Sequence, residues 1–539
     1  MTNEKKILKN KVYLYMTEFF AGTAVMAVEL CASRLMAPYF SSSQIVWTII
    51  IGTIMIAMAL GNIYGGRSAD RDPNPDRLYR RLLIAAVWIA AIPVLGKYII
   101  LGVSALMIFS VNQGFLIWAA FASCFIIFVF PLFLLGTVTP SLVKYTTDSL
   151  EDNGKTVGML GAFNTIGSII GTFLPTFVSI PAVGTAITFL IFSGVLLLIA
   201  VIYFIAARSH WKLLALCLVL FVICCVFGNS DRFAFWEDDL TYEGESVYNY
   251  LQVRENDRQV ILSTNVLFGV QSVKNKVDGL TGMYYDYAMV APLMAGSAAD
   301  GSRDILILGM GSGTYAVQCS RYFQDLNIEG VEIDEKIVDL SRRYFDLPES
   351  VPVTVYDGRA YLQAVEGKYD VIMVDAYQDI TIPYQMSSVE FFSMVRDHLR
   401  DGGVMVVNMN MKGSGEGAIN DYLADTIDLV FQDVYTVDVP GTTNRELFAS
   451  DSGRMTERLA QSLAGLSDSE QDRELHALMN RLQAHLVPYN GRDRILTDDQ
   501  APVELLGMKV IDELIAEEVA YYREVYERDG LSGLLDQVL

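Results

Sequence analysis

The sequence predicts a multi-span α-helical membrane domain followed by a Rossmann-like α/β domain, with a small β-hairpin sheet before the latter and a helical tail after it. Three observations predict this fold class. Long apolar runs fill about the first 230 residues, strand-like and helix-like runs alternate beyond residue 236, and three glycines at alternate positions follow the strand-like ILIL. We expect a transmembrane domain at 1–230, a small β domain with the first helix at 236–295, the Rossmann-like domain at 296–450, and a helical C-terminal region at 451–539.

Seven apolar runs are each about long enough to cross some 30 Å of hydrocarbon as a helix, the last one barely. They are Val12–Ala37, Ile45–Tyr64, Leu82–Ile108, Phe115–Val138, Val157–Ile180, Ala182–Ala207 and Leu213–Phe227. Basic residues gather in the N-terminal tail and in alternate loops such as GGRSADRDPNPDRLYRR, whereas the VNQG loop carries none. By the positive-inside rule, we expect a multi-pass protein of a bacterial-type plasma membrane with a cytoplasmic N-terminus.

The side of the membrane that the second half occupies stays open. Seven crossings from a cytoplasmic start would place it outside, where nucleoside cofactors are scarce. Either the Leu213–Phe227 run is not a true span, or another run is re-entrant, or the domain is extracytoplasmic.

Charge also separates the two halves of the chain. Up to Ser230 there are 15 Lys and Arg against 9 Asp and Glu, whereas the remainder has 25 against 53. Such an acidic half repels nucleic acid, so we expect no nucleic-acid partner, and it either attracts small cationic amines or is simply a solvated surface. Five of the six cysteines lie in apolar segments, and no Cys or His spacing suggests zinc, so we expect no disulfide framework and no metal.

The membrane half contains two carboxylates within an apolar run and two pairs of closely spaced glycines. Glu18 and Glu29 are eleven residues apart in the first run, which places them on one helix face as either a cation path or a structural feature. Two small-xxx-small pairs predict close contacts between helices. They are Gly61 with Gly65 and Gly167 with Gly171.

Glycines and a carboxylate follow the first two strands of the α/β pattern. Gly309, Gly311 and Gly313 begin directly after the apolar run ILIL and are typical of a nucleoside-binding turn. A dinucleotide fingerprint would place glycine at Thr314, so the turn fits NAD less well. Glu332 ends the second strand, where a carboxylate can bind ribose hydroxyls.

The next two strands are followed by further carboxylates. Asp357 and Gly358 come after the third strand, where a carboxylate can accept a hydrogen bond from an adenine amino group. Asp375 ends the fourth strand in VIMVDAY and faces the crevice where such sheets bind ligands. Features at four successive strand ends favour a nucleoside site over core packing.

These segments resemble the polyamine aminopropyltransferases, the spermidine synthase family. The matching segments are GMGSG, VEID, YDGRAYL, YDVIMVDAY and LRDGGVMVVN, with YNYLQV and GMYYDYAMVAPLMAG similar to the family's N-terminal hairpin and first helix. ELCASRLMAPYFSSSQIVW, GGRSADR and LTDDQAPVELL resemble the fused bacterial type, in which a multi-span domain precedes the enzyme. The resemblance implies a class I AdoMet-type fold.

The resemblance also implies a reaction. Decarboxylated AdoMet would be the co-substrate, and an amine would attack its propyl carbon and release methylthioadenosine. Asp375 matches the catalytic aspartate that takes the amine proton, and a protonated amine needs such a base because it has no free lone pair. Glu332 and Asp357 match the ribose and adenine contacts, and Asn249 matches a glutamine at the cofactor.

The amine side of the site departs from the family pattern. Ser312 stands where the family has an aspartate, Tyr285 matches a histidine, and the usual DxxDP is stretched so that Asp379 becomes the second carboxylate. These three are the candidate substrate-binding residues. Replacement contacts to the amine could come from four other residues, each equally explained as surface or packing. They are Tyr284, Asp286, Asp498 and Asp499.

Three functions follow from these patterns. The first is a membrane-bound aminopropyltransferase that acts on a polyamine or other small cationic amine, associates with the lipid bilayer and forms a homo-oligomer. The second is an AdoMet-dependent methyltransferase, which Ser312 in the glycine turn permits. The third is a polyamine transporter or sensor whose nucleoside domain does not catalyse, which Glu18 and Glu29 motivate.

Overall fold

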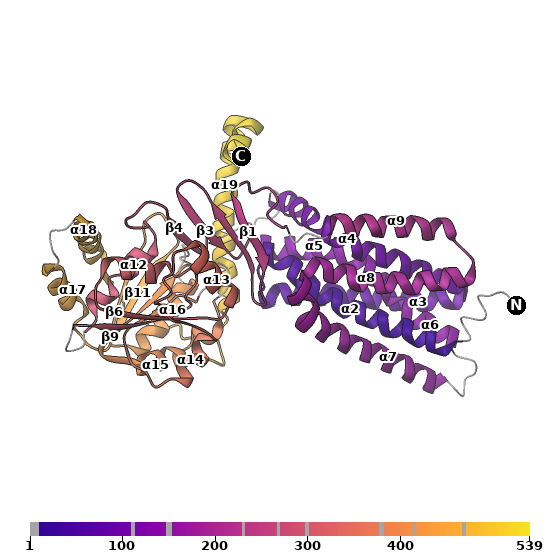
Figure 1. Ribbon diagram of the computed structural model, residues 1–539, viewed down its shortest axis with the longest axis horizontal. Helices are drawn as coiled ribbons and strands as arrows, with labels where there is room; N and C mark the ends of the chain where they lie inside the picture. The colour runs from indigo at the N-terminus through magenta and orange to yellow at the C-terminus, as the bar shows by residue number, and fades with distance from the viewer. Residues whose placement is uncertain are drawn as a thin grey trace. The chain divides into compact units, whose positions relative to one another are not determined.

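The computed structural model describes residues 10–108, 114–146, 153–228, 232–266, 270–296, 301–376, 382–411, 413, 417–465 and 470–538. The chain divides into two compact units, Met1–Phe235 and Trp236–Leu539. In Figure 1, the described part of the first unit consists of helices, and that of the second unit contains both strands and helices.

Helices make up the first unit in its described part. They are α2 (Lys11–Phe40), α3 (Gln44–Arg71), α4 (Pro75–Ile108), α5 (Phe115–Gly136), α6 (Val138–Thr146), α7 (Asn153–Leu174), η1 (Pro175–Ser179), α8 (Ile180–Ala207) and α9 (Trp211–Phe227). Five continuous segments are long and apolar enough to cross a membrane. They are Lys11–Phe40, Gln44–Arg71, Pro75–Met107, Phe115–Thr146 and Gly154–Ala207.

The seven predicted runs all fall on helices, but the structure arranges them as these five segments and one short helix. Gly184, at φ 82° and ψ 171°, breaks the helical path within the last segment. α7 and α8 both pack against α2 and run alongside it in Figure 1, so the chain reverses between them. α9 has 17 residues, which at about 1.5 Å per residue is slightly short of the hydrocarbon thickness.

Glycines allow close approach between the helices of this unit. A Cβ atom on Gly167 of α7 would lie 2.0 Å from the carbonyl oxygen of Phe19 in α2. A Cβ atom on Gly61 of α3 would lie 2.3 Å from the carbonyl oxygen of Phe133 in α5. The predicted small-residue contacts are therefore confirmed, and any larger side chain at either position would force the backbones apart.

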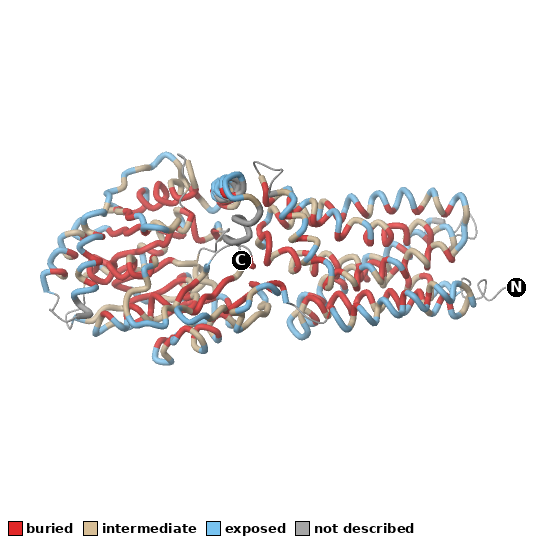
Figure 2. Tube along the Cα trace, turned by 90° about the horizontal axis from the view of Figure 1, so that it is seen from above, coloured by how far each residue is buried: buried red, intermediate tan, exposed pale blue. Residues whose placement is uncertain are grey.

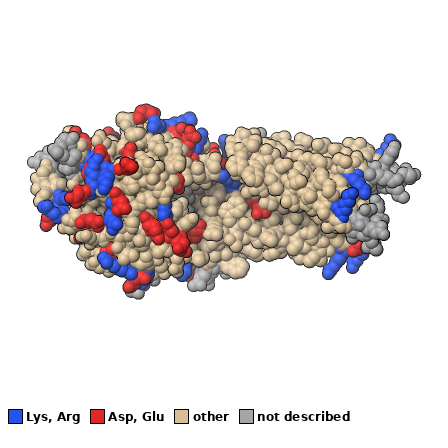
Figure 3. Space-filling model, turned by 90° about the horizontal axis from the view of Figure 1, so that it is seen from below, with Lys and Arg blue, Asp and Glu red and all other residues tan. Residues whose placement is uncertain are grey.

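The outer surface of the helical unit is largely apolar. Large exposed side chains include Met55 on α3, Phe173 on α7 and Val226 on α9. Figure 3 shows a face of this unit with few charged side chains, where Lys and Arg gather towards one end. A bundle that exposes so much apolar surface between charged ends suits a lipid environment.

The second unit begins with a small antiparallel sheet in the order β1-β2-β3-β4. Its strands are β1 (Leu240–Glu245), β2 (Tyr250–Glu255), β3 (Gln259–Ser263) and β4 (Ser272–Asn275). The hairpin predicted from YNYLQV and RQVILST corresponds to β2 and β3. Its apolar face, including Leu251 and Leu262, packs against Ile337 and Leu340 of α13 (Glu335–Tyr344).

The main sheet has eight strands in the order β12-β10-β11-β9-β8-β5-β6-β7. They are β5 (Arg303–Leu308), β6 (Leu326–Glu332), β7 (Val353–Val355), β8 (Tyr369–Val374), β9 (Leu399–Met409), β10 (Asp433–Asp438), β11 (Arg445–Ser450) and β12 (Val487–Pro488). The five predicted strands form the parallel part, from β7 to β9. β11, β10 and β12 add an antiparallel edge, so the Rossmann-like sheet is mixed.

Helices cover both faces of this sheet, and its strands are the most deeply buried part of the unit (Figure 2). One apolar core contains residues of α10 (Tyr284–Ala288), α11 (Ala291–Met294), α12 (Thr314–Tyr322), α17 (Met455–Ala464) and α18 (Glu470–His485). The other face is covered by α14 (Gly358–Ala364), α15 (Val389–Asp397) and α16 (Ile419–Val430), with α19 (Val503–Val538) against α16. The turn η2 (Tyr384–Met386) precedes α15.

Candidate active site

The parallel strands create a crevice at their carboxyl ends. β5 lies between β6 and β8, and the helices that follow β5 and β8 pack on opposite faces of the sheet. Open α/β sheets bind ligands at such a reversal. The residues that follow β5, β6 and β8 therefore come together at one place, although they are far apart in sequence.

The glycine turn after β5 depends on glycine for two reasons. Gly309 has φ 86° and Gly313 has φ 77°, which L side chains rarely adopt. A Cβ atom on Gly309 would lie 2.6 Å from the carbonyl oxygen of Asp375, and one on Gly313 would lie 2.7 Å from Leu347 Cδ1. The turn is thus pressed against the end of β8, and α12 begins directly after it.

Glu332 closes the opposite side of this turn. Its Oε2 accepts a hydrogen bond from the Gly311 N–H at 2.9 Å, and its Oε1 accepts one from the Asp334 N–H at 3.1 Å. Burial raises the pKa of Glu332, while these backbone hydrogen bonds act to lower it. Each carboxylate oxygen has a second lone pair, so Glu332 can also accept from a diol.

Asn249 is linked to the turn through Asp334. Its Nδ2 donates to Asp334 Oδ2 at 3.0 Å, and Ser246 Oγ donates to the same oxygen at 2.5 Å. Asp334 also caps α13 by accepting from the Lys336 N–H at 3.0 Å. The contact of Asn249 therefore ties the small sheet to Asp334, two residues after Glu332.

Asp357 acts as a helix cap. Its Oδ1 accepts from the Ala360 N–H at 2.8 Å, and Gly358 begins α14. A Cβ atom on Gly358 would lie 3.3 Å from Met386 Cε, so space is tight there as well. The structure thus shows a helix-capping role for Asp357 that the sequence pattern did not predict. The adenine contact that the sequence pattern did predict stays a prediction.

Asp375 lies at the centre of the polar cluster. Its Oδ2 accepts from the Tyr284 hydroxyl at 2.6 Å, and its Oδ1 accepts from Asn408 Nδ2 at 2.9 Å. Burial raises the pKa of Asp375 to about 7; the two hydrogen bonds lower it, and the Glu332 carboxylate raises it slightly. A carboxylate of this pKa can accept a proton near neutral pH.

The three residues predicted to bind substrate have different positions. The Tyr285 hydroxyl donates to the Gln271 carbonyl at 3.2 Å, so its neighbour Tyr284, not Tyr285, holds Asp375. Ser312 is 1% exposed, and its Oγ is 2.7 Å from Thr314 Oγ1. It belongs to the hydrogen bonding of the turn. Asp379 lies outside the described residues.

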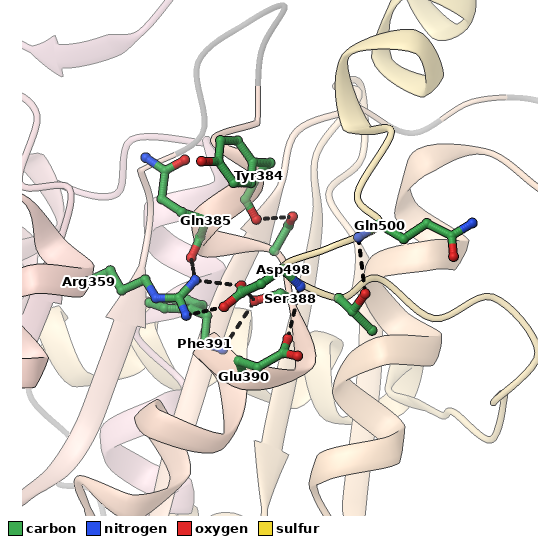
Figure 4. Close-up of polar contacts among 10 residues, drawn as sticks. Arg359, Tyr384, Gln385, Ser388, Glu390, Phe391, Asp498 and Gln500 are labelled. Atoms are coloured by element: carbon green, nitrogen blue, oxygen red, sulfur yellow. Dashed lines mark hydrogen bonds and ion pairs between the residues drawn. The ribbon is translucent and has the colours of Figure 1, made fainter.

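Other proposed amine contacts have structural roles instead. Asp286 is 1% exposed and accepts from the backbone N–H groups of Thr281 and Gly282 and from the Thr281 hydroxyl. Asp498 forms a two-pronged ion pair with Arg359, at 2.6 and 2.7 Å (Figure 4). The pair ties the segment before α19 to α14.

Sequence reasoning missed two buried polar residues in the crevice. Asn408 on β9 holds Asp375 and accepts from Asn444 Nδ2 at 2.8 Å. Glu446 on β11 is fully buried. A signal was available for Asn408, because it interrupts the apolar run VMVVNM. Glu446 follows Arg445 in RELFAS, where a second charged residue gives no such signal. No group of three or more potential metal ligands occurs among the residues that the structure describes.

Comparison with known proteins gives the family of this chain. The family described as "Spermine/spermidine synthase domain" matches residues 285–447. A probable polyamine aminopropyl transferase of Bifidobacterium longum is 52% identical over 350 residues, which cover 62% of this chain and 78% of that protein. The chain belongs to the polyamine aminopropyltransferase family.

Membership in this family makes the chain a transferase enzyme. The similarity covers more of this chain, and more of the helical unit, in another relative, a polyamine aminopropyltransferase of Oceanobacillus iheyensis. It is 22% identical over 432 residues, covering 76% of this chain and 79% of the relative. A solved spermidine synthase in complex with the transition-state analogue AdoDATO is 17% identical, with a TM-score of 0.36 over 46% of this chain and 87% of that one.

Proposed function

We propose that this aminopropyltransferase is membrane-bound and transfers an aminopropyl group from decarboxylated AdoMet to a polyamine acceptor. The observation that supports this most directly is Asp375, a carboxylate with a pKa near neutrality, held by Tyr284 and Asn408 beside the glycine turn. The acceptor must lose a proton to react, and Asp375 is placed to take it.

The donor would lie over the glycine turn. Its nucleoside would approach the backbone of Gly309, Gly311 and Gly313, and Glu332 would accept from the ribose hydroxyls. Asp357 would accept from the adenine amino group while it caps α14. These roles need only neutral donors from the nucleoside, and each carboxylate has lone pairs to spare.

The transfer step balances without any further reactant. The amine nitrogen forms a bond to the propyl carbon as the carbon–sulfur bond breaks, and the electron pair of that bond stays on sulfur. Methylthioadenosine leaves as a neutral thioether, and the proton of the amine passes to Asp375. A positioned base of matched pKa contributes about 10²- to 10⁴-fold to such a rate.

The helical unit supports the membrane part of the proposal. Five apolar segments have the length to span a bilayer, and exposed apolar side chains cover their outer surface. The N-terminus would lie in the cytoplasm, as the basic loops predict. The proposed enzyme acts as a homo-oligomer.

The test uses the purified full-length protein in detergent with putrescine or spermidine as acceptor. Decarboxylated AdoMet and AdoMet are supplied in separate reactions, and mass spectrometry identifies the nucleoside product. We expect methylthioadenosine from decarboxylated AdoMet. S-adenosylhomocysteine from AdoMet would instead indicate a methyltransferase, and neither product with any acceptor would favour a non-catalytic binding role.

Asp375→Asn is the matching variant. We expect turnover to fall by about 10²- to 10⁴-fold, because the amide cannot take the proton. The affinity for methylthioadenosine, measured by calorimetry, should stay within about threefold of that of the unaltered protein, since a near-isosteric change preserves the crevice. Unchanged product formation would remove Asp375 from the catalytic role.

A further inference from the structure

Glu18 is a buried carboxylate inside the helical unit. It lies on α2, about 10 Å along the helix axis from Lys11, and is 0% exposed. Its Oε2 has no hydrogen-bond partner among the residues that the structure describes. Ionisable side chains inside apolar helix bundles are costly and usually mark a functional site, so this carboxylate needs an explanation.

The hydrogen bonds of Glu18 are those of a neutral carboxylic acid. Its Oε1 accepts from the Thr139 hydroxyl of α6 at 2.6 Å and from Asn164 Nδ2 of α7 at 2.8 Å. A carbonyl oxygen can accept both bonds, and Oε2 is then the hydroxyl of the protonated acid. An ionised Glu18 would instead leave Oε2 charged and, within the described part of the chain, without a donor.

The charged groups of α6 and α7 are engaged elsewhere. Lys144 of α6 forms an ion pair with Asp70 of α3 at 3.0 Å. Lys155, the single charged residue of α7, is exposed. The two side chains that these helices direct to Glu18 are neutral, so they stabilise its orientation without supplying a counter-charge.

The titratable groups of α4 and α8 also have other partners. The Tyr79 hydroxyl of α4 lies 3.3 Å from Thr17 Oγ1. Asp76 of α4 accepts from the Tyr203 hydroxyl of α8 at 2.7 Å and lies 3.2 Å from His210 Nε2. α5 contains no charged residue. Neutralisation of Glu18 therefore requires a ligand from outside the described residues.

The close packing beside Glu18 restricts the size of that ligand. A Cβ atom on Gly22 of α2 would lie 2.6 Å from the Asn164 carbonyl oxygen, and one on Gly167 of α7 would lie 2.0 Å from the Phe19 carbonyl oxygen. The backbones of α2 and α7 thus meet within about one turn of Glu18. An organic amine or a hydrated metal ion would have to force these helices apart, whereas a proton needs no such space.

We propose that Glu18 is a proton-binding site of the helical unit, and that release of the proton opens the seam where Glu18 contacts Thr139 and Asn164. α6 and α7 both pack against α2 (Figure 1). Once ionised, Oε2 needs donors, and water supplies them when α6 or α7 moves away from α2. The proton passes to that water.

This motion is separate from the transfer reaction. Glu18 belongs to the first compact unit, whereas Asp375 and the glycine turn belong to the second. The helical unit would therefore respond to protons whether or not the second unit transfers an aminopropyl group.

Infrared spectroscopy tests the protonation directly. The full-length protein in detergent is compared with Glu18→Gln, which keeps an oxygen to accept from Thr139 and Asn164 and is neutral at every pH. The other carboxyl groups are common to both proteins, so the difference spectrum contains the carbonyl-stretch band of protonated Glu18. We expect this band at about pH 5 and expect it to decrease as the pH rises to about 9.

Hydrogen exchange measured by mass spectrometry tests the opening of the seam. The two proteins are compared at the same pH, so their intrinsic exchange rates are equal. At about pH 9, peptides from α6 and α7 should exchange about tenfold faster in the unaltered protein than in Glu18→Gln, and at about pH 5 the two should agree.

Glu29→Gln is the matched control for both measurements. It removes the other carboxylate of α2, about 16 Å further along the helix. We expect the Glu18 band and the exchange of α6 and α7 to be the same in this variant as in the unaltered protein.

Each remaining outcome overturns a defined part of the proposal. A band of constant intensity would identify a permanently neutral structural acid, and no band at any pH would identify a permanent charge; either result removes the proton site. A band that sodium chloride abolishes at constant pH, and potassium chloride does not, would assign the site to sodium instead. A titrating band with equal exchange in both proteins would support the proton site and overturn the opening of the seam.

Discussion

Asp375 shows how the surroundings of one residue set its chemistry. Two neutral donors hold its oxygens at 2.6 and 2.9 Å, which fixes its orientation and favours its charged form. Burial acts in the opposite direction and dominates, so the pKa rises to about 7. The balance gives a carboxylate that is both available as a base and able to hold the proton near neutral pH.

The pH dependence of kcat/KM should report this balance. Asp375 must be deprotonated to accept a proton, so activity should fall as the pH drops through about 7. Tyr284→Phe removes a hydrogen bond that favours the carboxylate, and we expect the acid limb to move up by about one pH unit.

Tyr285→Phe is the matched control for this shift. Its hydroxyl donates to Gln271 and not to Asp375, so the acid limb should stay in place. Rates are measured with decarboxylated AdoMet from about pH 5.5 to 9, a range that spans this titration. An acid limb that is the same in all three proteins would mean that another group controls the profile.

Among the elements, the close packing of helices α2 and α7 depends on glycine residues, which have no side chain. A Cβ on Gly167 would overlap the backbone of α2 at 2.0 Å, whereas a Cβ on Gly161 in the same helix meets nothing within 4 Å. Helix propensity alone would favour alanine at both positions. Close packing therefore explains why glycine stands at one of them.

Gly167→Ala and Gly161→Ala test this reasoning as a matched pair. Gly167→Ala should lower the thermal midpoint of the helical unit in detergent, because α2 and α7 must separate. Gly161→Ala should leave the midpoint equal or raise it slightly, because alanine favours the helix over glycine by about 1 kcal/mol at most. A similar effect of both changes would contradict the close contact.

The segment before α19 depends on a different kind of contact. Asp498 accepts from both guanidinium nitrogens of Arg359 and from Ser388 Oγ at 2.6 Å (Figure 4). The Arg359 side chain is 16% exposed and that of Asp498 39%. Because the pair is partly solvated, its contribution to the free energy of unfolding is limited to about 1 kcal/mol, although its geometry is two-pronged.

Asp498→Asn should reduce the free energy of unfolding by about 1 kcal/mol at pH 7. Arg359 holds the pKa of Asp498 below its ordinary value, so the stabilisation is present at neutral pH and is lost as the pH falls below about 4. Denaturant unfolding at pH 7 and at a pH below about 4 measures the free energy of unfolding of the variant and of the unaltered protein. Asp499→Asn, at the exposed neighbouring residue, should leave the free energy of unfolding unchanged at both pH values. If Asp498→Asn lost as much stability at low pH as at pH 7, that result would count against the ion pair.

At the scale of the whole molecule, the direction of α9 determines where the chain leaves the helical unit. α9 packs against α4 and α8, and Figure 1 shows it ending at the end of this unit opposite the start of α2. If α2 begins in the cytoplasm, the residues directly after α9 then lie on the other face of the membrane.

Reporter fusions test this topology in cells. We expect a fusion at Asn74, between α3 and α4, to report the cytoplasmic side, and a fusion at Gly228, after α9, to report the opposite side. Alkaline phosphatase and a fluorescent protein give complementary signals at each position. A cytoplasmic signal at Gly228 would show that the 17-residue α9 does not cross the membrane.

Features that depend on local pattern could be predicted from the amino-acid sequence. Apolar length predicted the helices of the first unit, and the turn glycines with the carboxylates at successive strand ends predicted a nucleoside crevice and the family. These could be predicted because each follows from residues adjacent in the chain. The family assignment is confirmed, and the roles of the individual site residues stay predictions.

The contacts between polar side chains could not be predicted in this way, because they depend on the packing of distant segments. Tyr284, rather than Tyr285, contacts Asp375 because of how α10 lies over the sheet. Asp286 and Asp498 are satisfied within the protein, whereas Glu446 is buried without a partner among the described residues. The physical reason is that hydrogen bonding and burial depend on contacts between distant segments, which strand pairing and helix packing alone bring together.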